Sequence, residues 1–265
     1  MCQFFSFVSD GNGKYFYSDW DARREYRSGK KTGLADSHTS IAHYAGYSGA
    51  AEDKLNKYEY NPITKCFRVD QINAKNDQGA AKDFCEALDF STIVPALRIK
   101  PITNPLKLNR KRVTKKDVAL LKKWASVRAS VWDSVGASVW DSVWASVRDS
   151  VRASVRDSVR ASVWASVWDS VRDSVGDSVG DSVGDSVGDS VGDSVWDSVG
   201  AYTGSFFVLP KWEHIKHRKG QYPFQCVVDL WENGLVPSFD GKVWRLHGGK
   251  DATVLWQGEF TNDSG

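Results

Sequence analysis

The sequence predicts a β-solenoid that is flanked and capped by small α+β segments, and three observations lead to this fold class. Residues 124–199 form an unbroken array of 19 tetrapeptides, each with Trp, Arg or Gly, then Ala or Asp, then Ser and Val. Such a repeat suits an α-helix poorly, because valines four residues apart are displaced by about 40° around the axis. The residues on both sides of the array contain the turn and cap motifs of ordinary α+β proteins.

In the predicted solenoid each tetrapeptide forms one side of a three-sided coil, so that a coil contains about 12 residues. The array would then stack about six coils at a spacing of about 4.8 Å. Valine would point inward, whereas the first position would face solvent, since only a solvated site tolerates Trp, Arg and Gly alike. Gly, Asp and Ser dominate the second half of the array, so disorder is the competing interpretation.

Charge and repetition divide the chain into four segments. Residues 1–106 are expected to form an N-terminal α+β domain, and residues 107–123 a basic linker that ends in a short helix. The solenoid would follow over residues 124–199, and residues 200–265 would form a C-terminal α+β cap. Whether the two flanks make one domain or two stays open.

The flanks contain starts, stops and turns of secondary structure. The sequence DGNG at residues 10–13 favours a hairpin turn, Asp36 or Ser37 favours a helix N-cap, and Gly234 favours a helix end. These signals predict hairpins over residues 2–17, 57–71 and 242–257, and helices over residues 19–26, 37–44, 77–88, 114–123 and 222–233.

The composition excludes a wholly disordered chain. With 265 residues, 41% of them hydrophobic, and a net charge of only +2, the chain has enough apolar material to bury a core. There is no run of about 18 apolar residues and no charged leader before an apolar stretch, so we expect neither a membrane span nor a secretory signal. Four scattered cysteines without a C-x-x-C pair predict free thiols in a cytosolic protein.

The first position of the repeat supplies the predicted binding surface. Before residue 172 this position is mostly Trp or Arg, and the solenoid would display these planar groups for stacking on bases or carbohydrate. An exposed aromatic row of this size also commonly marks an interface, so a homo-oligomer is an open alternative. The predicted binding residues are Trp124, Arg128, Trp132, Trp140, Trp144, Arg148, Arg152, Arg156, Arg160, Trp164 and Trp168.

Residues 107–123 carry eight basic residues and a single acid, Asp117. A cluster of this kind is typical of a contact with nucleic acid or another polyanion. A solvated helix face, or an intramolecular partner for the Asp-rich repeats, explains the same charge without any ligand. The residues assigned to the polyanion contact are Lys107, Arg110, Lys111, Arg112, Lys115 and Lys116.

Aspartate occupies the second position of each of the last eight repeats. In a solenoid these carboxylates would form ladders of like charge, which counter-ions relieve. We expect no cofactor, with calcium as the alternative, because hard cations favour several carboxylate oxygens. An acidic rod that imitates the phosphate rows of nucleic acid is the other interpretation. The candidate calcium ligands are Asp177, Asp181, Asp185, Asp189 and Asp193.

Catalytic signals are weak. Removal of Met1 would expose the Cys2 thiol beside its own amine, the arrangement of N-terminal-nucleophile amidohydrolases, but a buried strand thiol is the simpler explanation. His38 could supply an acid/base group, although short polar residues at a helix start are more often a cap. The sequence contains no phosphate-binding glycine loop, catalytic triad motif or metalloprotease helix.

Several segments carry a family resemblance: residues 1–7 (MCQFFSF), 36–41 (DSHTSI), 52–62 (EDKLNKYEYNP), the Ser-Val array, and residues 229–231, 234–242 and 244–247. Together they resemble uncharacterised repeat proteins that tailed bacteriophages encode. The resemblance covers nearly the whole chain and implies a phage protein made in the bacterial cytoplasm, with an array of variable length between fixed flanks. It implies no activity and no catalytic residue.

We therefore expect a non-enzymatic binding or structural protein that displays a repeat surface of variable length to a macromolecule of the host or the phage. A small enzyme in the flanks, with the array as a spacer, is the first alternative. The second alternative is a nucleic-acid-binding protein that uses the basic linker.

Overall fold

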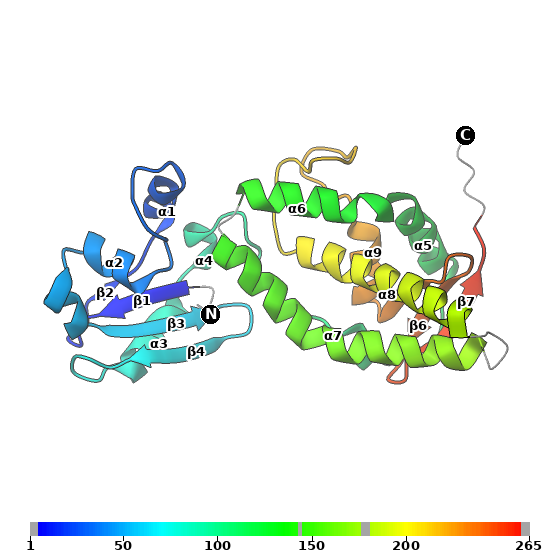
Figure 1. Cartoon of the computed structure of the whole chain (residues 1–265), viewed down its shortest axis with the longest axis horizontal. Coiled ribbons are helices and arrows are strands. Elements are labelled where there is room, and N and C mark those ends of the chain that lie inside the picture. Colours follow the sequence, from blue (N-terminus) through cyan, green and yellow to red (C-terminus); the bar gives the residue numbers. More distant parts are fainter. Residues whose placement is uncertain (1–4, 143–144, 176–180, 261–265) are drawn as a thin grey trace. The chain divides into compact units, whose positions relative to one another are not determined.

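The computed structural model of the chain describes residues 5–142, 145–175 and 181–260, and it contains helices and two antiparallel sheets (Figure 1). The chain divides into two compact units. Unit 1 comprises Met1–Pro101 with Val143–Val151, and unit 2 comprises Ile102–Ser142 with Arg152–Gly265. Each unit has its own sheet and its own buried core.

Unit 1 is built on a four-stranded antiparallel sheet in the order β2-β1-β3-β4. Its strands are β1 (Phe5–Ser9), β2 (Tyr15–Phe16), β3 (Asn56–Asn61) and β4 (Cys66–Gln71). The Asp10 carboxylate accepts hydrogen bonds from the backbone N–H groups of Asn12 (2.8 Å) and Lys14 (3.2 Å), which closes the β1–β2 turn. Both hairpins predicted for the N-terminal flank are confirmed.

Five short helices and a set of aromatic rings complete unit 1. The helices are α1 (Trp20–Arg27), α2 (His38–Tyr44), the 3₁₀ helix η1 (Gly49–Lys54), α3 (Gln78–Ala87) and α4 (Phe90–Ile93). The predicted N-cap Ser37 accepts from the Ser40 backbone N–H and starts α2. The core of the unit contains Phe5 and Phe7, which are fully buried, and Phe5 meets Phe90 edge to face at 5.2 Å.

Unit 2 combines the array helices with a three-stranded antiparallel sheet in the order β5-β6-β7. Its elements are the 3₁₀ helix η2 (Pro105–Leu108), α5 (Lys115–Val127), the 3₁₀ helix η3 (Arg128–Ser130), α6 (Val131–Ser142), α7 (Ala145–Val175), α8 (Asp181–Gly204), α9 (Gln225–Glu232), β5 (Leu235–Phe239), β6 (Trp244–Gly248) and β7 (Thr253–Gly258). The residues of α7 up to Val151 belong to unit 1. The predicted helices that became α5 and α9, and the predicted closing hairpin, are confirmed.

The predicted β-solenoid is wrong, because the described part of the array is helical. Figure 1 shows the repeats as the successive helices α6, α7 and α8, preceded by the last turn of α5 and by η3. Neither sheet contains a residue of the array. The fold is therefore α+β with a helical repeat segment.

Two serines of α8 show how repeats can be buried in a helix despite their poor helix propensity. The hydroxyls of Ser194 and Ser198 donate to the backbone carbonyls of Val191 and Val195, at 2.9 and 2.6 Å. Each hydroxyl thus finds its partner within its own helix and can be buried without desolvation penalty. The energy of packing then outweighs the weak intrinsic preference of Ser, Val, Asp and Gly for other conformations.

The valines of α7 stay buried although their row drifts around the helix. The seven valines of α7 between residues 147 and 171 are all buried, although six steps of about 40° spread them over roughly 240° of the helix surface. The array is also divided into shorter helices with different neighbours, since α6 packs on α8 and α8 packs on α9 and β5. A single flat partner face is therefore not required.

Candidate functional site

The basic segment, residues 107–123, is a fixed part of unit 2 rather than a free linker. Arg110 Nη2 lies 2.9 Å from Asp117 Oδ2, and Arg110 Nε donates to the Arg112 carbonyl at 2.7 Å. A Cβ atom added to Gly234 would lie 3.0 to 3.1 Å from the Cβ atoms of Leu108 and Arg110. The segment thus lies closely against the end of α9, where only glycine leaves enough room.

Asp117, the single acid of the segment, caps the N-terminus of α5. Asp117 and Thr114 form a capping box: the Asp117 carboxylate accepts from the Thr114 backbone N–H (2.8 Å), and Thr114 Oγ1 accepts from the Asp117 N–H (3.3 Å). The Asp117 side chain is buried and is also paired with Arg110. The surface of the segment therefore exposes no negative charge of its own.

Four lysines share one exposed face of α5. At 100° per residue, Lys115, Lys116, Lys122 and Lys123 fall within an arc of about 120°. The buried residues Asp117, Leu121 and Trp124 occupy the opposite side of the helix. The four ammonium groups start from backbone positions that span about 12 Å along the axis.

Three more cations precede the helix and complete what we call the basic face. All seven of its members are exposed, and none of them forms an ion pair with a described residue; they are Lys107, Lys111, Arg112, Lys115, Lys116, Lys122 and Lys123. Lys115 and Lys116 also stand in the first turn of α5, where the helix dipole disfavours positive charge. Asp117 in the same turn offsets part of this cost, so the exposure of the seven cations, and not the helix dipole, is what favours an external partner.

The structure changes the membership of the predicted polyanion contact. Arg110 is turned toward Asp117 and serves to fix the segment. Lys122 and Lys123, which the sequence analysis left out, join the face because they follow Lys115 by two helical turns. Helical periodicity applied to residues 115–123 would have found them.

The members of the predicted Trp and Arg binding row whose side chains the structure describes do not share one exposed surface. Trp124 is fully buried in unit 2 and meets Phe224 edge to face at 6.4 Å. Arg128 lies over the rings of Phe239 and Trp244, at 5.5 and 5.7 Å. The assumption that the first repeat position always faces solvent is therefore wrong, because helices turn equivalent positions in different directions.

The remaining members of the row have separate environments. Arg148 and Arg156 pair with the adjacent Asp149 (3.0 Å) and Asp157 (3.4 Å), Arg152 is exposed, and Trp168 is half-buried. Trp144, and the side chains of Trp140, Arg160 and Trp164, lie outside the described residues.

Asp197 joins the second and third repeats to the last one. Its carboxylate accepts from Trp132 Nε1 at 2.7 Å and lies 3.4 Å from Arg128 Nη1. Burial raises the pKa of Asp197, against the lowering effect of Arg128 and Trp132. The Trp132 ring also covers Gly200, where a Cβ would lie 3.1 Å from the indole. We call these contacts the repeat clamp.

Replacing Asp197 by alanine is expected to destabilise unit 2 by about 1–3 kcal/mol, because the Trp132 N–H and the Arg128 guanidinium lose their shared acceptor. Asp193→Ala removes the exposed aspartate of the preceding repeat and should change stability by less than about 0.5 kcal/mol. Urea denaturation followed by tryptophan fluorescence measures both. Equal losses in the two variants would contradict the clamp.

Two of the five candidate calcium ligands have described side chains. Asp189 and Asp193 are exposed on α8, one helical turn apart. Asp177, and the side chains of Asp181 and Asp185, lie outside the described residues. Within the described parts of the chain, no three His, Cys, Asp or Glu side chains gather in a group able to hold a metal ion.

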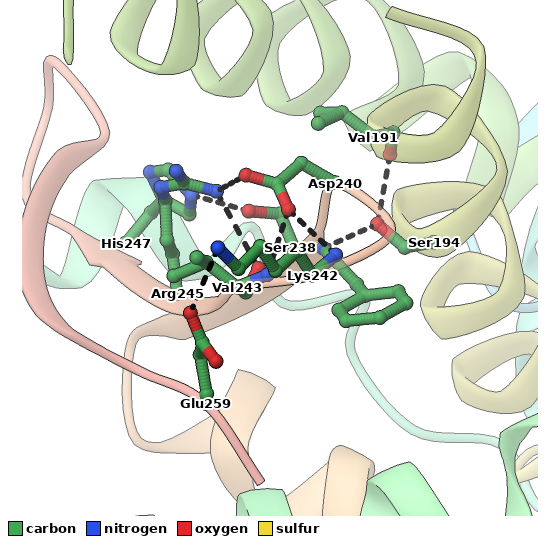
Figure 2. Close-up of polar contacts among 10 residues, drawn as sticks. Val191, Ser194, Ser238, Asp240, Lys242, Val243, Arg245, His247 and Glu259 are labelled. Carbon is green, nitrogen blue, oxygen red and sulfur yellow. Dashed lines mark hydrogen bonds and ion pairs between the residues drawn. The ribbon is translucent and has the colours of Figure 1, made fainter. Parts of the chain in front are cut away.

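A buried serine and histidine lie next to each other in unit 2, and the sequence analysis did not find them. Ser238 Oγ is 2.7 Å from His247 Nε2, and His247 Nδ1 is 2.8 Å from the Ala252 carbonyl oxygen. Because a carbonyl only accepts, Nδ1 carries the proton and Nε2 accepts from the serine hydroxyl. Figure 2 shows the pair beside the Arg245–Asp240 ion pair, with Ser194 of α8 nearby.

The environment of this pair makes it structural. Ser238 and His247 are both fully buried, so no substrate reaches the hydroxyl. Burial lowers the pKa of His247 to about 4, and the nearby Arg245 acts in the same direction, so the imidazole is neutral at pH 7. The two side chains satisfy each other's hydrogen-bonding groups inside the β5–β6 sheet.

Of the two weak catalytic candidates, the structure describes His38. His38, the first residue of α2, donates from Nε2 to the Tyr58 carbonyl (3.0 Å), and its Nδ1 lies 3.6 Å from Asp70 Oδ2. These contacts hold α2 on the sheet. Cys2 lies outside the described residues.

Comparison with known proteins gives no relative for this arrangement: no family model matches the chain, and neither curated proteins nor solved structures show significant similarity. None of the described helices combines the length and the apolar character needed to cross a membrane.

Proposed function

We propose that this chain is a non-enzymatic binding protein that contacts a polyanion, in the first place nucleic acid, through the basic face. The observation that carries the proposal is the grouping of seven exposed cations on a rigid segment whose only acid is buried. Phosphates bound there would release condensed counter-ions, which is the main source of affinity in sequence-independent binding.

The competing intramolecular explanation is not supported by the described contacts. The described aspartates of the array that form ion pairs do so with array arginines, as in Arg148–Asp149, Arg156–Asp157 and Arg128–Asp197. No such aspartate reaches the lysines of the basic face. The charge of the face is therefore available to an external partner.

The resemblance to phage repeat proteins fits this proposal. A phage protein in the bacterial cytoplasm encounters host and phage nucleic acid at high concentration. The buried Ser238–His247 pair, the arrangement nearest to a catalytic dyad among the described residues, is closed to substrate and favours binding over catalysis.

Binding is expected to show the salt dependence of phosphate contacts. Fluorescence anisotropy with labelled duplex DNA, single-stranded DNA and RNA, titrated between about 50 and 200 mM salt, gives the slope of log affinity against log salt. Replacing Lys111, Lys115 and Lys116 together by Gln should lower that slope by about 2 to 3 for a duplex, since each lost contact removes about 0.9.

A matched control removes the same charge elsewhere. Arg27, Lys30 and Lys54 are exposed residues of unit 1, and their joint replacement by Gln leaves the basic face intact. The control variant should retain the slope of the parent chain. Equal slopes for the two variants, or no binding to any of the three nucleic acids, would show the proposal to be wrong.

A further inference from the structure

Unit 1 contains a cavity of about 330 Å³ between the end of β2, α1 and α2. This volume lies at the lower end of the range for small-molecule sites. The cavity is unusually aromatic for its size, and its aromatic lining consists of Tyr15, Phe16, Tyr17, Tyr26 and Tyr44. Rings from three different elements thus surround one space, which suits a planar aromatic guest.

Lys31 is the cationic residue of the lining, which also contains Asp19, whose carboxylate accepts from the Ala22 backbone N–H as the N-cap of α1. The end of α1 positions Lys31, because the backbone N–H groups of Lys30 and Lys31 both donate to the Glu25 carbonyl. Its ammonium group lies 4.8 Å from the centre of the Tyr44 ring and 5.7 Å from that of Tyr26. The two rings meet edge to face at 5.6 Å and therefore hold the ammonium from two sides.

The charge of Lys31 is only partly compensated. Its Nζ lies 3.0 Å from Glu25 Oε2, but the Glu25 side chain is 47% exposed, so water screens the pair. An ammonium group has three donors, and the carboxylate takes one of them. Donors remain for an anionic group bound in the cavity.

Tyr44 adds a neutral donor, whereas the Tyr26 hydroxyl is closed to solvent. Tyr44 Oη accepts from the Thr32 backbone N–H at 2.9 Å, which leaves its own proton free to donate. The buried Tyr26 hydroxyl has no partner of good hydrogen-bond geometry in the described part of the chain, although Ser18 and Ser40 lie close enough to lower its pKa slightly. Burial has the larger, raising effect on the pKa of Tyr26, so its proton is retained at neutral pH.

We infer that this cavity binds a small planar aromatic molecule with an anionic group, of the size of a mononucleotide. The ring would stack among the tyrosines, and the anion would pair with Lys31. A cationic guest fits less well, because Lys31 places a positive charge beside the rings of Tyr26 and Tyr44. The inference concerns unit 1 alone and does not depend on the basic face of unit 2.

The test is isothermal titration calorimetry of the full chain with AMP, with adenosine and ribose 5-phosphate as matched probes. AMP should bind saturably below about 1 mM, adenosine at least about fivefold more weakly, and ribose 5-phosphate more weakly still. No saturation by AMP up to about 10 mM would overturn the inference. Equal affinity for AMP and adenosine would overturn the assignment of an anionic guest.

Variants locate the site. Lys31→Gln should remove the preference for AMP over adenosine, whereas Lys30→Gln, a change at the exposed neighbour, should not. Tyr44→Phe keeps the ring and should retain adenosine binding, which a misfolded variant would lose. If AMP affinity instead falls in the variant with Lys111, Lys115 and Lys116 replaced, the nucleotide binds to the basic face and the inference for the cavity is wrong.

Discussion

Lowering the pH from 6.5 to 4 is expected to destabilise unit 2 by about 3 kcal/mol through His247 alone. The pKa of this histidine falls from 6.5 to about 4 on folding, because burial penalises the imidazolium. Above pH 6.5 the ring is neutral in both states and contributes no pH dependence. Between pH 6.5 and 4 the unfolded chain binds a proton that the folded chain rejects, so stability falls as the pH falls.

Below pH 4 the contribution of His247 levels off, since both states are then protonated. Below pH 4 other groups determine how stability depends on pH. Burial raises the pKa of Asp240, but hydrogen bonds from Val243, Arg245 and Lys242 outweigh it, and the pKa of this carboxyl lies below its ordinary value. The stability that this carboxylate provides is lost only when the pH falls below the ordinary pKa of an aspartate. The histidine window is therefore separate from that of Asp240. The pKa of Asp197 is raised by burial, so its protonation in the folded state stabilises unit 2 as the pH falls and offsets part of the histidine effect.

Urea denaturation at a series of pH values, followed by tryptophan fluorescence, measures the effect. All tryptophans except Trp20 and Trp144 belong to unit 2, so the signal reports mainly on that unit. His247→Gln offers one donor and one acceptor in place of the imidazole and should flatten the curve between pH 6.5 and 4. His214→Asn removes an exposed histidine at a left-handed position that Asn tolerates, and it should leave the curve unchanged.

The elements of the flanks could be predicted because their signals are local. The N-cap Ser37, the turn that begins at Asp10 and the helix stop at Gly234 each act over a few residues. Strand β5 was not among the predicted elements. It contains Pro237, which is tolerated because β5 lies at the edge of the β5-β6-β7 sheet.

The array could not be predicted because its pattern does not determine its partners. The displacement of about 40° between successive valines argued against a helix, yet the described valines of α7 from Val147 to Val171 are all buried. Ser194 and Ser198 bond back to their own helix, and the repeat pattern does not report this contact. Tertiary packing outweighed propensity here.

The candidate site was predicted in part. Charge alone located the basic segment, because a cluster of lysines with one acid is visible in the sequence. The contact of Arg110 with Asp117 depends on a loop that folds back, and no local pattern reports it. The Ser238–His247 pair and the aromatic cavity likewise depend on contacts between separate elements.

The array offers a direct test of why equal repeats are not equivalent. Trp124 and Trp132 hold the same position of the repeat, yet Trp124 is fully buried and Trp132 is 47% exposed. A solenoid with outward tryptophans predicts the same small loss for both alanine variants. The helical structure predicts a loss of about 3–5 kcal/mol for Trp124→Ala, because a large core cavity opens against Phe224.

Trp132→Ala should cost only about 1–2 kcal/mol, from the lost hydrogen bond to Asp197 and the partial burial of the ring. Trp124→Phe gives a further check: the indole N–H of Trp124 has no partner in the described structure, so a smaller apolar ring should recover much of the loss. Urea denaturation of the three variants measures the free energies of unfolding. Equal losses for Trp124→Ala and Trp132→Ala would contradict the helical packing of the first repeats, whereas a difference of about 2 kcal/mol or more would show that position in the helix, and not position in the repeat, determines which tryptophans form the core.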